Sequence, residues 1–201
     1  MLFELPPAAR ELQAAARRVA ETAIAPRAAD VDRAETYPWD NVAALREAGL
    51  IGYTIPRTYG GAGGSFLDAA VIIEEMARVC GVTGRIAVET NIGAISAVMQ
   101  YGSKAQKQLA ARLVLDGDKP AICITEPEAG SAATDMTTRA DRRNGYWLLN
   151  GHKHWITGGG VSKLHLIFAR TPDGIAGFLA VRGRSEPVAI FSLDPNLQEA
   201  P

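Results

Sequence analysis

The first 117 residues show apolar positions that recur every three or four residues, which is the spacing of amphipathic helices. About five helices are predicted on this basis, covering residues 8–24, the segment from Pro38 to Gly49, the segment from Ser65 to Cys80, and residues 85–100 and 104–116. Pro26 should break or restart the first helix, because proline lacks the amide hydrogen that a helix interior needs. A serine followed three residues later by aspartate or glutamine, at residues 65–68 and 103–106, predicts two helix starts with capping boxes. These features indicate an all-α N-terminal helical bundle.

From Lys119 onwards the pattern changes to the alternation that is typical of β-strands. Strands are predicted at residues 120–125, 145–150, 152–157, 164–170 and 175–182, which would form a small antiparallel sheet or barrel. The change near Pro120 predicts a boundary between a helical domain, residues 1–118, and a β-domain, residues 119–201. The stretch from Arg184 to Pro201 has turn residues and no clear period.

Two segments of the predicted β-domain carry the candidate chemistry. AICITEPEAGSAATDM, which starts at Ala121, reads as a short apolar strand that runs into a polar loop. NGYWLLNGHKHWIT is predicted to contain a hairpin whose turn is Asn150-Gly151, a dipeptide favoured in two-residue turns. In such a strand Trp155 and Thr157 would point to the same side, where an indole and a hydroxyl could meet the face and the polar edge of a planar heterocycle. The glycines at 158–160 would let the backbone pass close to that ligand.

The motif TEPEAGS, followed by NG-x-K-x-WIT-x-GG, resembles the middle β-domain of the acyl-CoA dehydrogenase flavoproteins. The resemblance covers roughly residues 5–182 and implies that FAD is the cofactor. The implied cofactor contacts are Ile122, Ile124, Thr125, Gly130, Ser131, Trp155, Ile156 and Thr157. In the family, the serine matching Ser131 also reaches the CoA substrate. The family's closing helical domain, which holds the catalytic glutamate, has no counterpart in the matched part, so no catalytic residue is expected in this chain and the β-domain is expected to be incomplete at its C-terminal end.

A narrower resemblance links YPWDNVAALREAGL, GRIAVETNIGAI, KPAICITEPEAGSAA and WITGGGVSKLHLIFAR to the 3-sulfinopropionyl-CoA desulfinases. In that subgroup an arginine at the place of Arg85 holds the sulfinate of the substrate, so Arg85 and Ser131 are the implied substrate contacts. The chain also has Ala132 directly after the loop serine, where typical dehydrogenases have aspartate. From the residues alone, Arg85 could equally extend to the surface or pair with Glu89 one helical turn later.

The resemblance implies FAD-linked chemistry on an acyl-CoA thioester. The first hypothesis is α,β-dehydrogenation, in which hydride leaves the β-carbon for the flavin and an electron-transfer flavoprotein serves as partner. The alternative is a 3-sulfinopropionyl-CoA desulfinase that releases sulfite without net flavin redox. A third hypothesis is a non-catalytic truncated fragment of such a protein. A homo-oligomer, a dimer or a tetramer as in the family, is expected in each case.

Composition excludes several other classes of function. A net charge of −1 and a pI of about 6.3 give no electrostatic case for nucleic acid or an anionic membrane. No apolar run approaches the ~20 residues needed to cross a bilayer. The N-terminus lacks the basic start and apolar core of a signal peptide, and the two cysteines form no metal pattern. A reduced cytoplasmic protein is therefore expected.

Other candidate residues favour structural roles. His152 and His154 share a predicted strand face but lack a third ligand, so exposed histidines and no metal site are expected. Glu126 is interpreted as structural and Glu128 as solvated, while Tyr146 and Trp147 are interpreted as packing residues because no basic patch lies beside them. Cys80 and Cys123 are expected to be buried. The glycine-rich segment 59–64 lacks the GK[ST] ending of a phosphate loop and is interpreted as a flexible connector.

Overall fold

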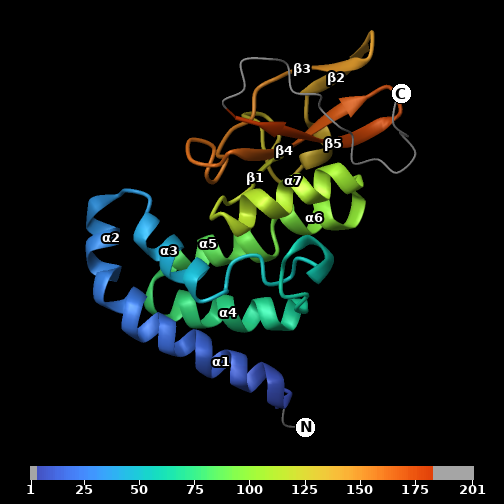
Figure 1. Ribbon diagram of the computed structural model, residues 1–201. Helices are drawn as coiled ribbons and strands as arrows, with labels where there is room; N and C mark the ends of the chain where they lie inside the picture. The colour runs from blue at the N-terminus through green and yellow to red at the C-terminus, as the bar shows by residue number, and fades with distance from the viewer. Residues whose placement is uncertain (1–3, 183–201) are drawn as a thin grey trace.

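The computed structural model describes residues 4–182, with helices in the first part of the chain and a five-stranded sheet in the second (Figure 1). The α-helices are α1 (Pro7–Val19), α2 (Ala28–Ala34), α3 (Trp39–Glu47), α4 (Phe66–Val79), α5 (Gly81–Asn91), α6 (Ala94–Tyr101) and α7 (Lys104–Leu115). The strands are β1 (Ala121–Cys123), β2 (Arg139–Arg143), β3 (Tyr146–Asn150), β4 (Leu164–Thr171) and β5 (Gly174–Val181). The predicted class, a helical N-terminal part followed by a small β-domain, is confirmed. The predicted irregular stretch from Arg184 to Pro201 lies outside the described residues.

Helix boundaries follow the predicted signals closely. Ser65 and Asp68 form a capping box at the start of α4, and Ser103 and Gln106 form another at the start of α7. The predicted helix over residues 8–24 ends as an α-helix at Val19 and continues as a π-turn and a 3-10 turn that contains Pro26. Proline therefore restarts the helix as α2, as its missing amide hydrogen requires.

The buried helix predicted over residues 85–100 is two helices, α5 and α6, with a break at Ile92 and Gly93. Asn91, the last residue of α5, bonds through its side-chain amide to a neighbouring segment. Its Nδ2 donates to Leu50 O at 2.9 Å, and its Oδ1 accepts from Tyr53 N at 2.6 Å. The side chain is fully buried, so these bonds fix the end of α5 on the segment that follows α3.

The glycine-rich segment 59–64 is an ordered connector rather than a flexible one. The amides of Gly61, Gly63 and Gly64 donate to the carbonyls of Pro56, Ile55 and Tyr53, at 3.4, 2.9 and 2.8 Å. A Cβ at Gly61 would lie 2.1 Å from the Ile55 carbonyl oxygen, so the close packing itself requires glycine. Because these amides are used internally, the segment is not a phosphate loop.

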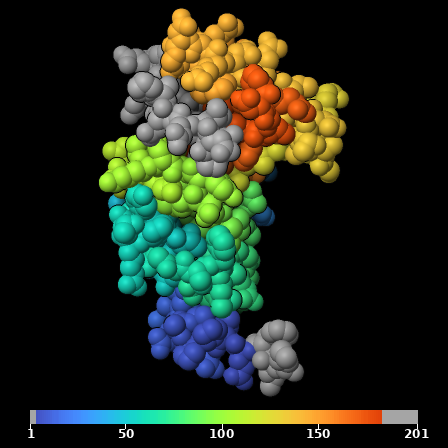
Figure 2. Space-filling model, turned by 90° about the vertical axis from the view of Figure 1, so that its right-hand side faces the viewer, coloured from blue at the N-terminus to red at the C-terminus, as the bar shows by residue number. Residues whose placement is uncertain are grey.

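One hydrophobic core joins the helices to the sheet. Its buried members include Ile72 and Met76 on α4, Val98 on α6, and Leu164 and Leu166 on β4. In Figure 1, α6 and α7 lie next to the sheet, and α1 lies at the far end of the helical part. Figure 2 shows the same order as an elongated surface, with the β-domain at one end and α1 at the other. The sheet therefore packs on the helical part.

The sheet is mixed, whereas a purely antiparallel sheet was predicted. β4 pairs in parallel with β1 and, at its end, with β2, and it pairs in antiparallel with β5. β2 and β3 form an antiparallel hairpin. The connection from β1 to β4 spans about forty residues, long enough for the crossover that a parallel pair needs.

The predicted hairpin around Asn150-Gly151 is wrong. The hairpin instead joins β2 to β3 through Asn144-Gly145, with Arg143 opposite Tyr146. The chain contains two Asn-Gly dipeptides, and the first one makes the turn, with Gly145 at φ +84°. β2 was missed because RADRR has no alternating apolar face beyond Ala140. Residues 152–157, predicted as a strand, have no strand structure.

No helix within residues 4–182 has the length and the apolar composition that crossing a bilayer requires.

Candidate functional site

The loop after β1 lies directly beside the segment that carries Trp155. The amide of His154 donates to Thr125 O at 2.8 Å, so the two predicted candidate segments are in contact. Within the loop, Glu126 and Ala129 exchange backbone hydrogen bonds at 3.1 and 3.2 Å and form a tight turn. The resemblance placed implied cofactor contacts on both segments, and the two segments do lie side by side, although the second is not the predicted strand.

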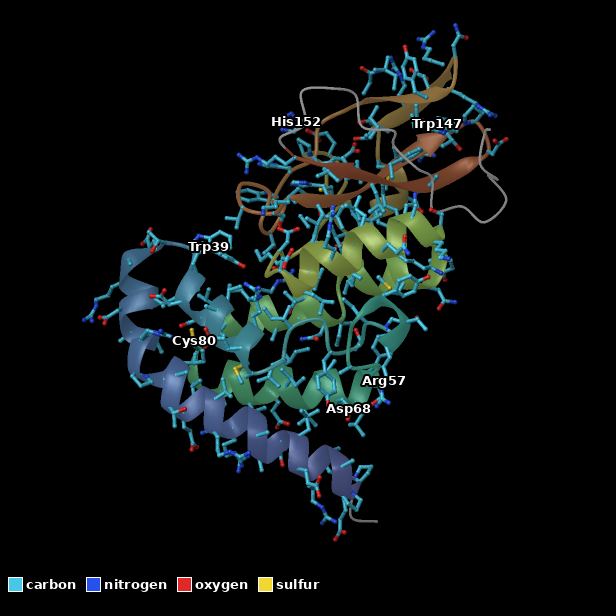
Figure 3. All side chains as sticks on the ribbon, in the orientation of Figure 1. Trp39, Arg57, Asp68, Cys80, Trp147 and His152 are labelled. Carbon is cyan, nitrogen blue, oxygen red and sulfur yellow. The ribbon has the colours of Figure 1, made fainter. Side chains whose placement is uncertain are left out.

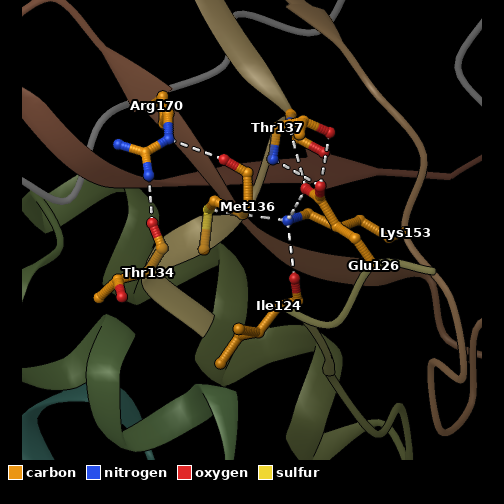
Figure 4. Close-up of polar contacts among 8 residues, drawn as sticks. Ile124, Glu126, Thr134, Met136, Thr137, Lys153 and Arg170 are labelled. Carbon is orange, nitrogen blue, oxygen red and sulfur yellow. Dashed lines mark hydrogen bonds and ion pairs between the residues drawn. The ribbon is translucent and has the colours of Figure 1, made fainter. Parts of the chain in front are cut away.

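A buried ion pair holds the loop and the second segment together (Figure 4). Lys153 Nζ donates to Glu126 Oε1 and to Ile124 O, each at 2.8 Å. The two side chains are 10% and 3% exposed, so the pair is largely shielded from water. Thr137 donates to the same carboxylate from its amide at 2.6 Å and its hydroxyl at 2.8 Å. Glu126 thus joins three segments of the chain.

The hydrogen bonds keep Glu126 ionised in the folded protein. Burial raises the pKa of this carboxyl, but the hydrogen bonds from Lys153, Thr138 and Thr137 outweigh it and lower the pKa well below its usual range. The predicted structural role of Glu126 is confirmed by these bonds, and Glu128 is exposed as predicted. A permanently ionised, fully bonded carboxylate cannot serve as a general base for a substrate.

Trp155 projects into solvent from an irregular backbone. Trp155 is 81% exposed. Its backbone φ angle is +55°, which is rare for a residue other than glycine. The indole stacks on His154, with ring centroids 4.4 Å apart and an angle of 19° between the planes. The prediction that strand pleating aligns Trp155 with Thr157 is wrong, because the segment is not a strand. Thr157 is nevertheless also exposed, and Ile156 is half-buried.

The remaining predicted cofactor contacts lie on β1 and in the loop that follows it. Ile122 and Ser131 are exposed, Thr125 is half-buried, and a Cβ at Gly130 would meet no atom within 4 Å. In the described part of the chain, the hydroxyls of Thr125, Ser131 and Thr157 make no hydrogen bond. Ile124 is half-buried beside them. An exposed flat ring with nearby available hydroxyls fits a planar, polar-edged ligand such as a flavin.

A second ion-pair cluster lies against the chain directly after Thr157. Arg85 Nε donates to Glu89 Oε1 at 3.0 Å, and Lys119 Nζ donates to Glu89 Oε2. Glu89 and Lys119 are 5% exposed, whereas the Arg85 side chain is 56% exposed. An ideal Cβ at Gly158 would lie 2.9 Å from Lys119 Nζ, so the cluster contacts the backbone directly after Thr157. The pairing of Arg85 with Glu89 that the sequence allowed is confirmed.

Tyr37 covers Lys119 within this cluster. Lys119 Nζ lies 5.6 Å from the ring centroid of Tyr37, whose edge meets Trp39 with centroids 4.6 Å apart. Burial raises the pKa of the Tyr37 phenol, and the charges of Glu89 and Asp118 act in the same direction. The phenol therefore stays neutral across the physiological range.

Of the other residues predicted to be structural, His154 stacks on Trp155, whereas Trp147 lies in the hairpin formed by β2 and β3. Trp147 on β3 packs edge-on against Phe178, with ring centroids 5.6 Å apart, and Tyr146 is half-exposed. His152 and His154 have ring centroids 6.3 Å apart, and residues 4–182 contain no cluster of three metal-ligating side chains. Figure 3 labels Trp147 and His152 in the β-domain and Cys80 among the helices.

Both cysteines are buried and free, as predicted. Cys80 joins α4 to α5, and Cys123 lies on β1. Burial raises the pKa of the Cys123 thiol to about 11, and Lys153 opposes this shift. The thiol is therefore protonated at neutral pH and is no nucleophile.

Four residues that hold the site were missed from the sequence. Lys153 and Lys119 supply the buried cations, and Asp118 accepts backbone hydrogen bonds from Lys163 and Leu164 at 2.8 and 3.0 Å. Arg170 Nε donates to Met136 O at 2.7 Å and ties β4 to the end of the loop. Lys153 could have been noticed, since it lies inside the recognised motif NG-x-K-x-WIT. The other three carry no signal in the local sequence.

Family comparisons match nearly the whole described chain. The family model for the acyl-CoA dehydrogenase N-terminal domain matches residues 6–118, and that for the acyl-CoA dehydrogenase middle domain matches residues 121–195. A 3-sulfinopropanoyl-CoA desulfinase of Paraburkholderia xenovorans (strain LB400) is 63% identical over 185 residues, which cover 90% of this chain and 48% of that relative. The chain spans about half the length of the curated relatives it matches.

Solved structures share the fold. A glutaryl-CoA dehydrogenase from Mycobacterium smegmatis in complex with FADH2 has a TM-score of 0.82 at 28% sequence identity, over 88% of this chain and 46% of that chain. A structure described as the electron transferring flavoprotein of Acidaminococcus fermentans has a TM-score of 0.85 at 28% identity, over 92% of this chain and 50% of that chain.

Proposed function

The chain belongs to the acyl-CoA dehydrogenase family, and we propose that its site binds FAD and acts on an acyl-CoA thioester. The resemblance seen in the motifs is confirmed by the family match. The single observation that carries the proposal is the exposed indole of Trp155, whose segment is held beside the loop after β1 by the bond from His154 to Thr125 and by the Lys153–Glu126 pair.

The chain's own residues would bind and orient the cofactor. Trp155 offers a flat apolar ring, while the hydroxyls of Thr125, Ser131 and Thr157 offer donors for the polar edge of the flavin. Ile122, Ile124, Gly130 and Ile156 would supply the apolar and backbone surface between them. When bound, FAD supplies a ring that accepts hydride. The catalytic base of the dehydrogenases has no counterpart among the residues assigned to this site.

Desulfination is the second candidate function, and Arg85 favours it. The Arg85 side chain is 56% exposed and bonds to Glu89. Glu89 bonds in turn to Lys119, which lies next to the backbone that follows Thr157. A cation at this place suits an acyl-CoA whose acyl end carries an anion such as a sulfinate. The 63% identity to a relative named 3-sulfinopropanoyl-CoA desulfinase supports the same choice.

Flavin binding by the purified 201-residue chain tests the proposal. We expect added FAD to bind and its fluorescence to be quenched, with affinity reduced about tenfold in Trp155→Ala, since base–aromatic stacking is worth about 1–3 kcal/mol. Tyr146→Ala is the matched control, because it removes another exposed aromatic residue of the β-domain, 51% exposed and outside the site. A folded chain that binds no FAD would refute the proposal and leave the non-catalytic fragment standing.

Two assays separate the two reactions. Sulfite release from 3-sulfinopropanoyl-CoA that is lost in Arg85→Ala would support desulfination. Reduction of an electron-accepting dye by butyryl-CoA would support dehydrogenation, for which an electron-transfer flavoprotein is the proposed physiological partner. The proposed homo-oligomer is tested by light scattering on the FAD-loaded protein.

A further inference from the structure

The carboxylate of Glu89 is shared between two cations from different parts of the chain. One oxygen accepts from Arg85 Nε at 3.0 Å within α5, and the other accepts from Lys119 Nζ, thirty positions later. Glu89 and Lys119 are each 5% exposed. A buried carboxyl group that bonds to two cations is held in one geometry, because each of its oxygens must stay on its partner.

This arrangement leaves the two terminal nitrogens of the Arg85 guanidinium available for a ligand. Among the described residues, the hydrogen bonding of Arg85 uses Nε alone, and the side chain is 56% exposed. The two terminal nitrogens form the fork that binds a carboxylate or a sulfinate through two parallel hydrogen bonds. Fixing Nε on Glu89 sets the plane and the direction of that fork.

Lys119 fixes the other end of the arrangement to the Trp155 segment. Its backbone carbonyl accepts a hydrogen bond from Ser162 Oγ, and its ammonium lies 2.9 Å from the position that a Cβ on Gly158 would occupy. The preceding Asp118 accepts the amides of Lys163 and Leu164 at 2.8 and 3.0 Å. Glu89 is thus fixed relative to the backbone that follows Thr157.

We propose that Glu89 is a positioning residue that orients the Arg85 guanidinium toward the anionic end of a short acyl thioester. Through its bond to Lys119, Glu89 also fixes the position of Arg85 relative to the Trp155 segment. This inference rests on the proposed function, because it needs Arg85 to contact the substrate. It adds two residues, Glu89 and Lys119, that would affect substrate binding only by positioning Arg85.

The proposal makes a prediction opposite to that of simple electrostatics. Removing the negative charge of Glu89 makes the surroundings of Arg85 more positive, so charge alone predicts tighter binding of an anion. Positioning predicts weaker binding, because the guanidinium loses the partner that holds its plane and must be ordered by the ligand itself. The sign of the effect therefore distinguishes the two explanations.

The test is calorimetric titration of the FAD-loaded chain with 3-sulfinopropanoyl-CoA and, separately, with butyryl-CoA, whose acyl group carries no charge. For Glu89→Gln we expect about tenfold weaker binding of the sulfinate thioester, because a misaligned Arg85 would lose about one charge-assisted hydrogen bond to the sulfinate. The affinity for butyryl-CoA should change by less than about twofold. Unchanged or tighter binding of the sulfinate thioester would overturn the proposal.

A second variant covers the case in which Glu89→Gln fails to fold. Glu89→Asp keeps the charge but is one methylene too short to reach both Arg85 and Lys119, so positioning predicts the same selective loss and charge alone predicts no change. Glu75→Gln is the matched control: this carboxylate is 1% exposed and also accepts hydrogen bonds from two arginines, Arg17 and Arg78, but lies on α4. It should leave both affinities unchanged.

Failure of the proposed function gives a different result. If Arg85→Ala leaves the preference for the sulfinate thioester intact, or if the wild-type chain shows none, the assignment of Arg85 to the substrate is wrong and the inference falls with it. If Arg85→Ala abolishes the preference while both Glu89 variants retain it, the proposed function stands and only the positioning role is refuted.

Discussion

Replacing Lys153 by methionine should destabilise the chain strongly and loosen the site. The substitution keeps most of the side-chain volume but removes the cation that bonds to Glu126 Oε1 and Ile124 O, each at 2.8 Å. The Glu126 carboxylate then remains buried without a counter-charge, because its side chain is only 3% exposed. An unpaired buried charge is among the most costly defects that a single substitution can create.

The magnitude follows from what remains around Glu126. Loss of one member of a buried pair costs about 3–5 kcal/mol. Three hydrogen bonds to the carboxylate survive, two from Thr137 and one from the Thr138 amide at 2.9 Å, so the lower end of that range, about 3 kcal/mol, is expected. Lys163→Met is the matched control, because Lys163 is an exposed lysine near the same segment, and it should change stability by less than about 0.5 kcal/mol.

Urea unfolding followed by circular dichroism measures the difference, with FAD affinity as a second readout. A loss below about 1 kcal/mol for Lys153→Met, no larger than that of an exposed pair, would refute the reasoning from burial.

The same pair predicts the direction of a pH effect. The folded-state pKa of Glu126 is depressed, so its contribution to stability is present above the unfolded pKa, about 4.3, and is lost as the pH falls below it. Wild-type stability should therefore decrease between about pH 5 and pH 3 more steeply than that of Glu126→Gln. Equal slopes in this window would contradict the depressed pKa.

Three smaller predictions concern single residues. Gly151→Ala should cost about 1–3 kcal/mol in urea unfolding, because the new Cβ would lie 2.6 Å from Thr138 Cα. Ser103→Ala should cost about 1 kcal/mol by the same assay, because Ser103 Oγ accepts the Gln106 amide at the start of α7. Cys123, whose pKa is raised to about 11 by burial, should react with iodoacetamide at pH 8 only after unfolding, as peptide mapping by mass spectrometry would show.

The sequence was most informative where structure depends on local chemistry. The two capping boxes, the restart at Pro26 and the buried strands β4 and β5 were predicted because each depends on residues within one or two turns or along one alternating run. The choice between the two Asn-Gly dipeptides failed for the opposite reason. Both dipeptides fit a tight turn. The turn forms at Asn144-Gly145 because Tyr146–Asn150 pairs with Arg139–Arg143 rather than with residues 152–157.

The contacts that hold the site could not be predicted, because their partners are far apart along the chain. Lys153 reaches Glu126 across 27 positions, and Lys119 reaches Glu89 across 30. Apart from the motif NG-x-K-x-WIT, which contains Lys153, no local pattern distinguishes a lysine that will be buried in such a pair from one that stays in solvent, such as Lys163. Only the fold brings the charges together.

The two buried pairs together explain how an exposed tryptophan keeps an unfavourable backbone conformation. A residue other than glycine with φ near +55° costs of the order of 1–3 kcal/mol, so it persists only where the surroundings over-determine it. Lys153 fixes the chain two residues before Trp155 by bonding to Glu126, and Lys119, bonded to Glu89, lies against Gly158 three residues after it. The segment is thus held at both ends by charges that cannot leave their partners, while the indole between them faces outward. Because both flanks are fixed, the backbone of Trp155 has little freedom to relax, and the indole that it carries stacks on His154 with ring centroids 4.4 Å apart.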